Sequence, residues 1–96
     1  MRFSGFDWDD GNWPKCGKHG VSKEEVESLF NDDPGIYEDA GHSSAEQRLR
    51  AIGPTYEGRM ILVAFTIREM DEGTFIRPVS ARYMHQKEIR RYEFDT

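Results

Sequence analysis

Lys18 and His19 stand immediately before a strong helix start, and both side chains can carry or move a proton. A histidine ring ordinarily titrates at about pH 6.5, so it can act as acid or base in neutral solution. A lysine ammonium can hold a phosphate oxygen or, if desolvated, take part in proton transfer. This pair therefore suits a site that handles phosphate. The alternative is that both residues are solvated loop residues with no chemical role.

The helix start that follows this pair is defined by a capping box. Ser22 can accept a hydrogen bond from the first free helix amides, and Glu25 can reach back to the amide of Ser22. Gly20 lets the chain turn sharply before it. The spacing predicts a helix over residues 23–31, and its apolar stripe consists of Val26, Leu29 and Phe30.

Arginine and serine side chains in the second half of the chain are the candidate phosphate contacts. Ser80 and Arg82 share parity on a predicted strand, so both point to one face. Arg77 has the opposite parity, unless Pro78 marks a bulge that shifts it. A guanidinium can bind two phosphate oxygens at once. Further arginines stand at predicted strand starts or ends, where a cleft rim would lie: Arg48, Arg59 and Arg68.

Each of these side chains also has an interpretation without catalysis. Arg82 can pair with a carboxylate of the last helix, either Glu88 or Glu93. Arg48 can pair with Glu46 on the surface. Ser80 can be a small packed residue, and His42-Ser43 can cap a turn.

The elements that must position these residues follow from hydrophobic periodicity. Met60 to Ile67 is apolar on both faces and is predicted to be the central strand. Pro78 cannot donate to a ladder, so its strand should lie at an edge or be bulged there. Glycine and proline make a regular helix over residues 9–18 doubtful. The other predicted elements are strands at 2–8, 36–38, 47–52 and 75–82, and a helix at 83–94.

This order of elements predicts an α+β fold, with a central antiparallel sheet and helices packed on one side. The 96 residues correspond to one domain, 1–96. Twelve aromatic residues are available for its core. No apolar run approaches the roughly 20 residues of a membrane span, and no signal peptide is visible. The single Cys16 excludes an internal disulfide and gives no zinc pattern. We therefore expect a cytoplasmic protein without metal or other cofactor.

The charge is unevenly distributed along the chain. The net charge of −5 argues against simple nonspecific binding to nucleic acid. Residues 1–47 hold 4 Lys/Arg and 11 Asp/Glu, whereas residues 48–96 hold 9 Lys/Arg and 7 Asp/Glu. The average thus hides an arginine-bearing region beside an acidic one. The alternative is that these arginines cover solvated strand and helix faces.

Several short motifs occur in order along nearly the whole chain. Together they closely resemble the BrnT family of toxins. They are Phe6-Asp7-Trp8-Asp9, then Lys18-His19-Gly20-Val21-Ser22, then His42-Ser43 with Glu46 and Arg48, then Gly58-Arg59, and finally Ile76-Arg77 with Ser80-Ala81-Arg82.

The resemblance implies a RelE-like fold and a toxin that cleaves RNA without a metal ion. It also implies a BrnA-like antitoxin encoded beside the toxin, and a heterotetramer of the two proteins that touches operator DNA only through the antitoxin. The expected catalytic residues are Lys18, His19, Ser80 and Arg82, and the expected RNA-binding residues are Arg48, Arg59, Arg68 and Arg77. We also expect an antitoxin segment to place carboxylates against the arginines. The alternative function is a catalytically weak binding module that acts mainly as antitoxin partner and co-repressor.

Overall fold

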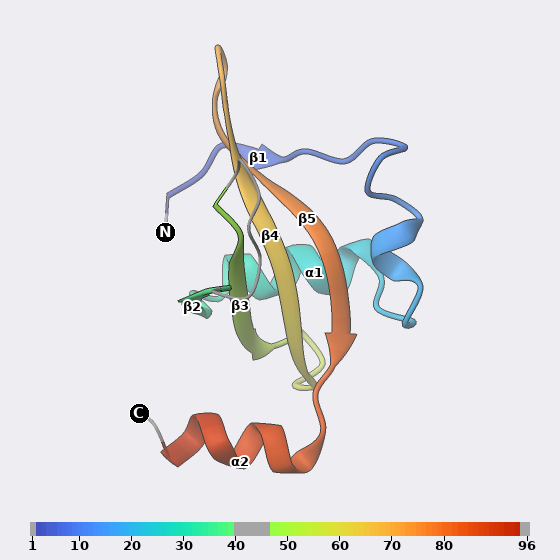
Figure 1. Cartoon of the computed structure of the whole chain (residues 1–96), viewed down its shortest axis with the longest axis vertical. Helices are drawn as coiled ribbons and strands as arrows, with labels where there is room; N and C mark the ends of the chain where they lie inside the picture. Colours follow the sequence, from blue (N-terminus) through green and yellow to red (C-terminus); the bar gives the residue numbers. More distant parts are fainter. Residues whose placement is uncertain (1, 40–46, 95–96) are drawn as a thin grey trace.

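The fold is an α+β arrangement of a five-stranded sheet and two helices, as the sequence predicts (Figure 1). The computed structural model describes residues 2–39 and 47–94. The strands are β1 (Gly5–Phe6), β2 (Gly35–Glu38), β3 (Leu49–Pro54), β4 (Met60–Met70) and β5 (Gly73–Tyr83). The helices are α1 (Lys23–Asn31) and α2 (Gln86–Phe94), and a 3₁₀ turn, η1, spans Lys15–Gly17.

The strands follow the spatial order β1-β5-β4-β3-β2, so β4 is the central strand, as predicted. The pairs β2–β3, β3–β4 and β4–β5 are antiparallel. The sheet is nevertheless mixed, because β1 runs parallel to β5. The strand predicted over residues 2–8 is only two residues long, because only Gly5 and Phe6 pair with β5.

A bulge in β5 decides which side chains share a face. Phe65 of β4 pairs with Pro78, but Ala64 pairs with Ser80, so Val79 is an extra residue. Proline has no amide to donate, and a bulge is one of the few places where an inner strand tolerates it. The extra residue shifts parity, so Arg77 lies on the same face as Ser80, which is the alternative that the sequence left open.

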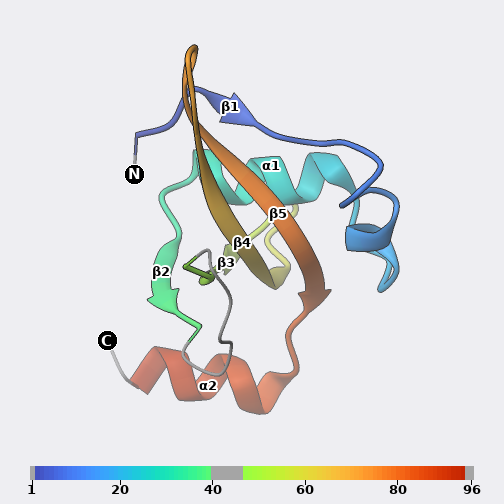
Figure 2. The same ribbon diagram turned by 45° about the horizontal axis from the view of Figure 1, so that its top comes forward.

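Helix α1 covers one face of the sheet (Figure 2). Its observed bounds are those predicted, and the Ser22–Glu25 capping box is formed in both directions. Its apolar stripe packs into a core with alternate residues of β3, β4 and β5, among them Ala51 and Phe65. Both of these side chains are fully buried, with relative exposures of 0%. Burial of this stripe, rather than intrinsic propensity, is what stabilises so short a helix.

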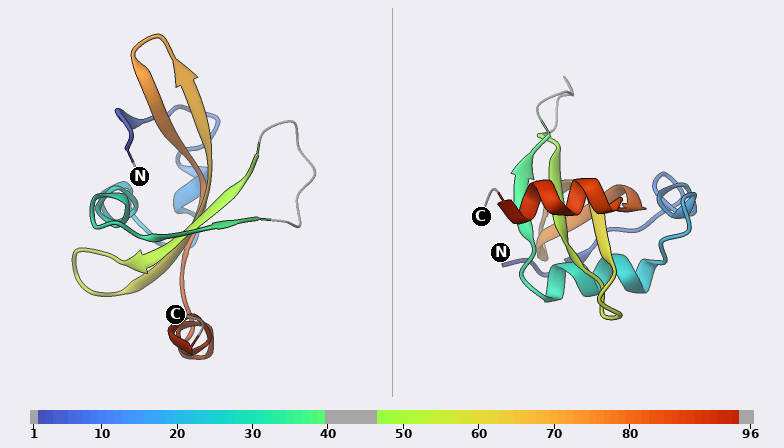
Figure 3. Two further views of the ribbon diagram at one scale, coloured as in Figure 1. Left: turned by 90° about the vertical axis from the view of Figure 1, so that its left-hand side faces the viewer. Right: turned by 90° about the horizontal axis from the view of Figure 1, so that it is seen from below.

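Helix α2 is not on the same side of the sheet as α1, so the prediction that the helices pack on one side needs correction. It lies beyond the ends of β4 and β5 (Figure 3). Its described contacts are made with Arg82 and Tyr37, which the strand register places on the face opposite α1. Met84 and His85 separate β5 from α2.

The segment between β1 and α1 runs along the outer side of β5. Asn12 anchors it: its side-chain amide donates to the carbonyls of Asp7 and Pro78, at 2.9 and 2.8 Å. Asn12 is 3% exposed, so its polar atoms need these partners. The segment contains η1 but no regular α-helix, as predicted.

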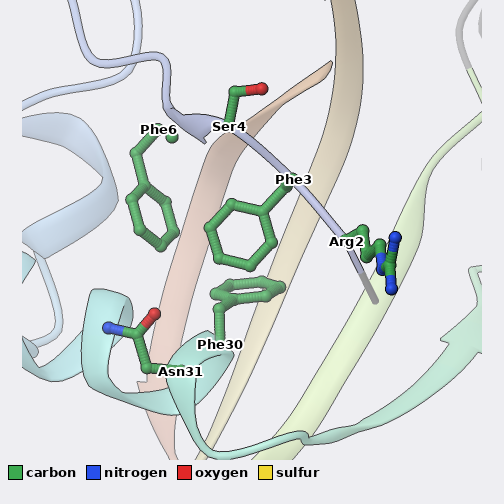
Figure 4. A pocket seen from close by; sticks show the side chains of 7 residues that line it. Arg2, Phe3, Ser4, Phe6, Phe30 and Asn31 are labelled. Atoms are coloured by element: carbon green, nitrogen blue, oxygen red, sulfur yellow. The ribbon is translucent and has the colours of Figure 1, made fainter. Parts of the chain in front are cut away.

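A surface pocket of about 660 Å³ lies between β1 and the end of α1 (Figure 4). The rings of Phe3, Phe6 and Phe30 meet edge to face beside it, with centroids 5.2–6.3 Å apart. None of the predicted site residues lines this pocket. In the described part of the chain, no helix is long and apolar enough to cross a membrane.

Candidate functional site

Polar and cationic side chains from three adjacent strands share the sheet face opposite α1. The register pairs Arg82 with Leu62, Ser80 with Ala64, and Arg77 with Thr66, and paired residues point to the same side. Arg50 pairs with the same Ala64 from the other flank. We call this the arginine face, and its members are Arg50, Thr66, Arg68, Arg77, Ser80 and Arg82.

Arg82 is held by a carboxylate of α2, which was one of the two interpretations of this residue. Its two terminal nitrogens donate to the two carboxylate oxygens of Glu88 at 2.7 and 2.8 Å. This fork geometry is the strong form of an ion pair. The guanidinium, together with the backbone amide of His85, lowers the pKa of Glu88 from 4.5 to about 2. Arg82 is still 42% exposed, so a ligand can reach it.

Arg77 is engaged more fully, because two carboxylates of the N-terminal segment surround it. Its guanidinium donates to Asp9 at 2.9 and 3.0 Å and to Asp7 at 3.1 Å. The hydrogen bond from Arg77 lowers the pKa of Asp9. Only 14% of the Arg77 side chain is exposed. In this structure Arg77 ties the segment after β1 to β5, and its contact with RNA stays a prediction.

Arg50 is a member of the arginine face that the sequence analysis missed. It lies in the middle of β3, where Tyr37 of β2 and Ala64 of β4 are its direct neighbours. A usable signal was present, because Arg48 and Arg50 alternate with Leu49 and Ala51, and such alternation indicates one polar face. The Nε atom of Arg50 is buried and has no hydrogen-bond partner among the described residues.

Lys18 and His19 lie at the turn between η1 and α1, and both are exposed. The turn sits beside the C-terminal end of β5, where the Tyr83 hydroxyl lies 3.4 Å from the carbonyl oxygen of Gly20. Gly20 has a φ of 95°, which favours glycine. Tyr83 points to the side opposite its neighbour Arg82, so the Lys18–His19 turn and the arginine face meet the end of β5 from different sides.

Tyr83 joins this turn to a second charged cluster that the sequence analysis did not identify. Its hydroxyl donates to the carboxylate of Glu25 at 2.8 and 2.9 Å, and this bond raises the pKa of Tyr83. The guanidinium carbon of Arg59 lies 3.5 Å from the centre of the Tyr83 ring, a cation–π contact. Burial raises the pKa of Glu25, but hydrogen bonds from Ser22 and Tyr83 outweigh it and the net shift is downward.

The remaining predicted residues are distributed around the sheet. Arg48 pairs with Asp39 at 3.4 Å. The predicted alternative partner, Glu46, lies outside the described residues, as does the His42-Ser43 motif.

Arg68 lies near the far end of β4, exposed and paired in register with Phe75. The structure thus brings Ser80, Arg82, Arg77 and Arg68 onto one face. Arg59 instead contacts the Tyr83 ring, and Lys18 and His19 lie in the turn whose Gly20 carbonyl is beside the Tyr83 hydroxyl.

Metal-ligating side chains do not cluster in the described ranges. Within residues 2–39 and 47–94, no three His, Cys, Asp or Glu side chains are arranged to hold a metal ion.

Comparison with known proteins identifies one family. No curated protein matches the chain. The family model described as "Ribonuclease toxin, BrnT, of type II toxin-antitoxin system" matches residues 8–88, which include η1, α1, strands β2 to β5 and the start of α2. Because this match covers most of the 96 residues, the chain belongs to the BrnT family of ribonuclease toxins of type II toxin–antitoxin systems.

Proposed function

We propose that this chain is an endoribonuclease that cleaves RNA without a metal ion, arrests growth, and is neutralised by a BrnA-like antitoxin. The observation that carries the proposal is the arginine face. Its four arginines come from three adjacent strands and share one side of the sheet with Ser80. Phosphate contacts made by arginine supply most of the affinity of a protein for a nucleic-acid backbone.

Cleavage without a metal needs a base, an acid and cations around the reacting phosphate. The base removes the proton of the 2′-hydroxyl, whose oxygen then attacks the neighbouring phosphorus. The bond from phosphorus to the 5′-oxygen breaks, and the acid returns a proton to that oxygen. The products are a 2′,3′-cyclic phosphate and a 5′-hydroxyl. A positioned acid or base typically contributes about 10²–10⁴-fold, and oriented cations contribute a similar factor.

The proposed roles follow from chemistry and position. Arg82 is exposed enough to meet the phosphate. Ser80 is the next residue of β5 on the same face. His19 is the proposed acid or base, and Lys18 the proposed phosphate contact beside it. The Lys18–His19 pair and the Ser80–Arg82 pair approach the end of β5 from different sides. RNA must therefore cross this strand end to meet both pairs. Arg48, Arg59, Arg68 and Arg77 are proposed contacts along the RNA backbone.

The direct test uses the purified chain freed of its antitoxin. A labelled RNA incubated with it should be cut equally well with and without a chelator, and the fragments should end in cyclic phosphate. Induced expression without the antitoxin should stop growth. Cleavage that disappears with chelator would contradict metal independence, whereas the absence of any cleavage would contradict the enzyme.

The second candidate function is a binding module that acts mainly as antitoxin partner and co-repressor. One observation favours it: Arg77 and Arg82 are already paired with carboxylates of this chain. In that case the chain should bind its antitoxin and support repression, while neither cutting RNA nor stopping growth. Growth arrest by the wild-type chain, lost in a folded variant of the site, separates the two functions.

A further inference from the structure

Two buried polar atoms without partners lie close together on the arginine face. The Nε atom of Arg50 and the Oγ1 atom of Thr66 are both buried and unbonded within the described part of the chain. Thr66 as a whole is only 6% exposed. A buried polar group without a partner destabilises the folded chain, so two of them on one face call for an explanation.

The strand register places these two groups around a small residue. Ala64 pairs with Arg50 on β3 and with Ser80 on β5, and Thr66 is the next residue of β4 on the same face. Neighbouring strands are about 4.8 Å apart, so Arg50 and Ser80 flank a floor roughly 10 Å wide. Ala64 is small and only 4% exposed, so the larger side chains around it cover it. Arg50, Thr66 and Ser80 form a row that therefore combines a guanidinium with two hydroxyls around the small residue Ala64.

We infer that Arg50, Thr66 and Ser80 form a phosphate-binding site at the centre of the arginine face, which holds a backbone phosphodiester of the RNA. This inference rests on the proposed function, because it names the contact that one RNA phosphate makes. Arg50 is a binding residue that neither the motifs nor the family match assigns.

A phosphodiester fits this row better than the carboxylate of a protein partner does. The donors come from three strands and approach from different directions, which suits the tetrahedral oxygens of a phosphate. A planar carboxylate is satisfied by a single guanidinium fork, as Glu88 is by Arg82. The neighbouring Arg77 and Arg82 already have such carboxylates, whereas Arg50 has no ion pair with any described residue.

The test measures binding of an RNA oligonucleotide with 2′-O-methyl groups, which cannot supply the attacking hydroxyl. With the full chain, Arg50→Ala should weaken affinity about tenfold or more, because a charge-assisted hydrogen bond is lost. It should also lower the slope of log affinity against log salt by about 0.7. Arg50→Lys should keep the slope and lose part of the affinity. Arg90→Ala removes the same charge from an exposed position of α2 and should change affinity less than twofold.

Thr66→Val provides a readout that a merely structural role would not give. It removes an unpaired buried hydroxyl, so the melting temperature should stay equal or rise. RNA affinity should fall about threefold or more if that hydroxyl donates to the phosphate. A lower melting temperature with unchanged affinity would contradict this role of Thr66.

The outcomes separate this site from the proposed nuclease. If a folded Arg50→Ala protein binds the RNA within twofold of wild type, the site is wrong even when the wild type cleaves RNA. If the wild type cleaves nothing but its binding depends on Arg50, the nuclease is wrong and the site stands. If Arg50→Ala weakens only the antitoxin complex, the row is a protein contact and the inference is overturned. A wild type that does not bind the RNA also overturns it.

Discussion

At the scale of single residues, Arg82 can stabilise the fold through its ion pair while its guanidinium stays available to a phosphate. Glu88 holds its guanidinium in a defined orientation, while 42% of the side chain stays exposed. Preorganised donors cost little reorganisation when charge develops on a phosphate. The pair with Glu88 therefore does not contradict a catalytic role, and variants can separate the two effects.

The first prediction concerns the proposed catalytic residues. His19→Ala and Arg82→Ala should each reduce RNA cleavage by about 10²-fold or more, because each removes a transition-state contact. Lys18→Ala should weaken cleavage by less if Lys18 only positions phosphate. RNA cleavage and thermal unfolding are measured for each variant.

Glu88→Gln is the matched control for Arg82→Ala. It breaks the same ion pair but keeps the guanidinium, so any loss of stability should appear in both variants. Cleavage should fall strongly only in Arg82→Ala. Near wild-type cleavage in both His19→Ala and Arg82→Ala would show that the site assignment is wrong.

The second prediction concerns the titration of Glu88. Its pKa is lowered to about 2 in the folded chain, from an ordinary 4.5. The contribution of the ion pair to stability is therefore full above about pH 4.5 and is lost as the pH falls toward 2. Carboxyl NMR signals measured during an acid titration should place the midpoint of Glu88 well below 4.5. In Arg82→Gln the midpoint should return toward 4.5, and a wild-type midpoint near 4.5 would disprove the pair.

The third prediction concerns the single thiol. Burial raises the pKa of Cys16 to about 11, and the residue is 1% exposed. The nucleophilic thiolate is therefore scarce at neutral pH, and reagents cannot reach it. A thiol reagent should label the native chain very slowly and the urea-unfolded chain rapidly. Fast labelling of the native chain would mean that Cys16 of η1 is not buried in solution.

At the scale of elements, the start of α1 links helix stability to the candidate site. Glu25 completes the capping box with Ser22 and also accepts the hydroxyl of Tyr83 from β5. One carboxylate thereby joins the start of α1 to the end of β5. The turn that carries Lys18 and His19 is held between these elements.

The fourth prediction tests the capping box. Ser22→Ala should lower the free energy of unfolding by about 1 kcal/mol, since the amide of Glu25 loses its acceptor. Ser22→Asp keeps an acceptor at the cap and should cost much less. Urea unfolding of the three proteins measures both values. Equal stability of the Ala and Asp variants would show that the cap contributes little.

At the scale of the whole molecule, the fold brings the acidic first half of the sequence against the arginines of the second half, so part of the charge on each is neutralised. Acidic Asp7 and Asp9 of the first half meet Arg77 of the second, and Asp39 meets Arg48. The Arg-bearing region and the acidic region are therefore joined by ion pairs. The arginine face keeps Arg50 and the exposed part of Arg82 for an anionic ligand.

The fifth prediction concerns the antitoxin, which a type II toxin requires as partner. Co-expression with the neighbouring gene product should give a complex that elutes in gel filtration at the size of a heterotetramer and does not cleave RNA. Because carboxylates are expected against the arginines, the complex should dissociate more readily at high salt. A chain that stays monomeric and harmless beside that gene product would contradict the partnership.

Much of the fold could be predicted from the sequence because it depends on local patterns. The bounds of α1 follow from Ser22, Glu25 and the stripe beginning at Val26, which are all local. The central position of β4 follows from its two-sided apolar composition. Observed strand ends differ from the predicted ones by a few residues, because pairing with a neighbour, rather than composition, decides where a ladder stops.

The site depends on what distant segments do to one another, so the sequence determined it only in part. It determined that Ser80 and Arg82 share a face and that Arg82 could pair with Glu88, since period and reach are local properties. Only the tertiary structure decided that the bulge at Pro78 brings Arg77 to that face, that Arg50 flanks Ala64 on it, and that Tyr83 holds Glu25. The physical reason is register. One extra residue in a strand reverses the side of the sheet to which the residues before it point, relative to the residues after it, and only the pairing between strands determines where that extra residue lies.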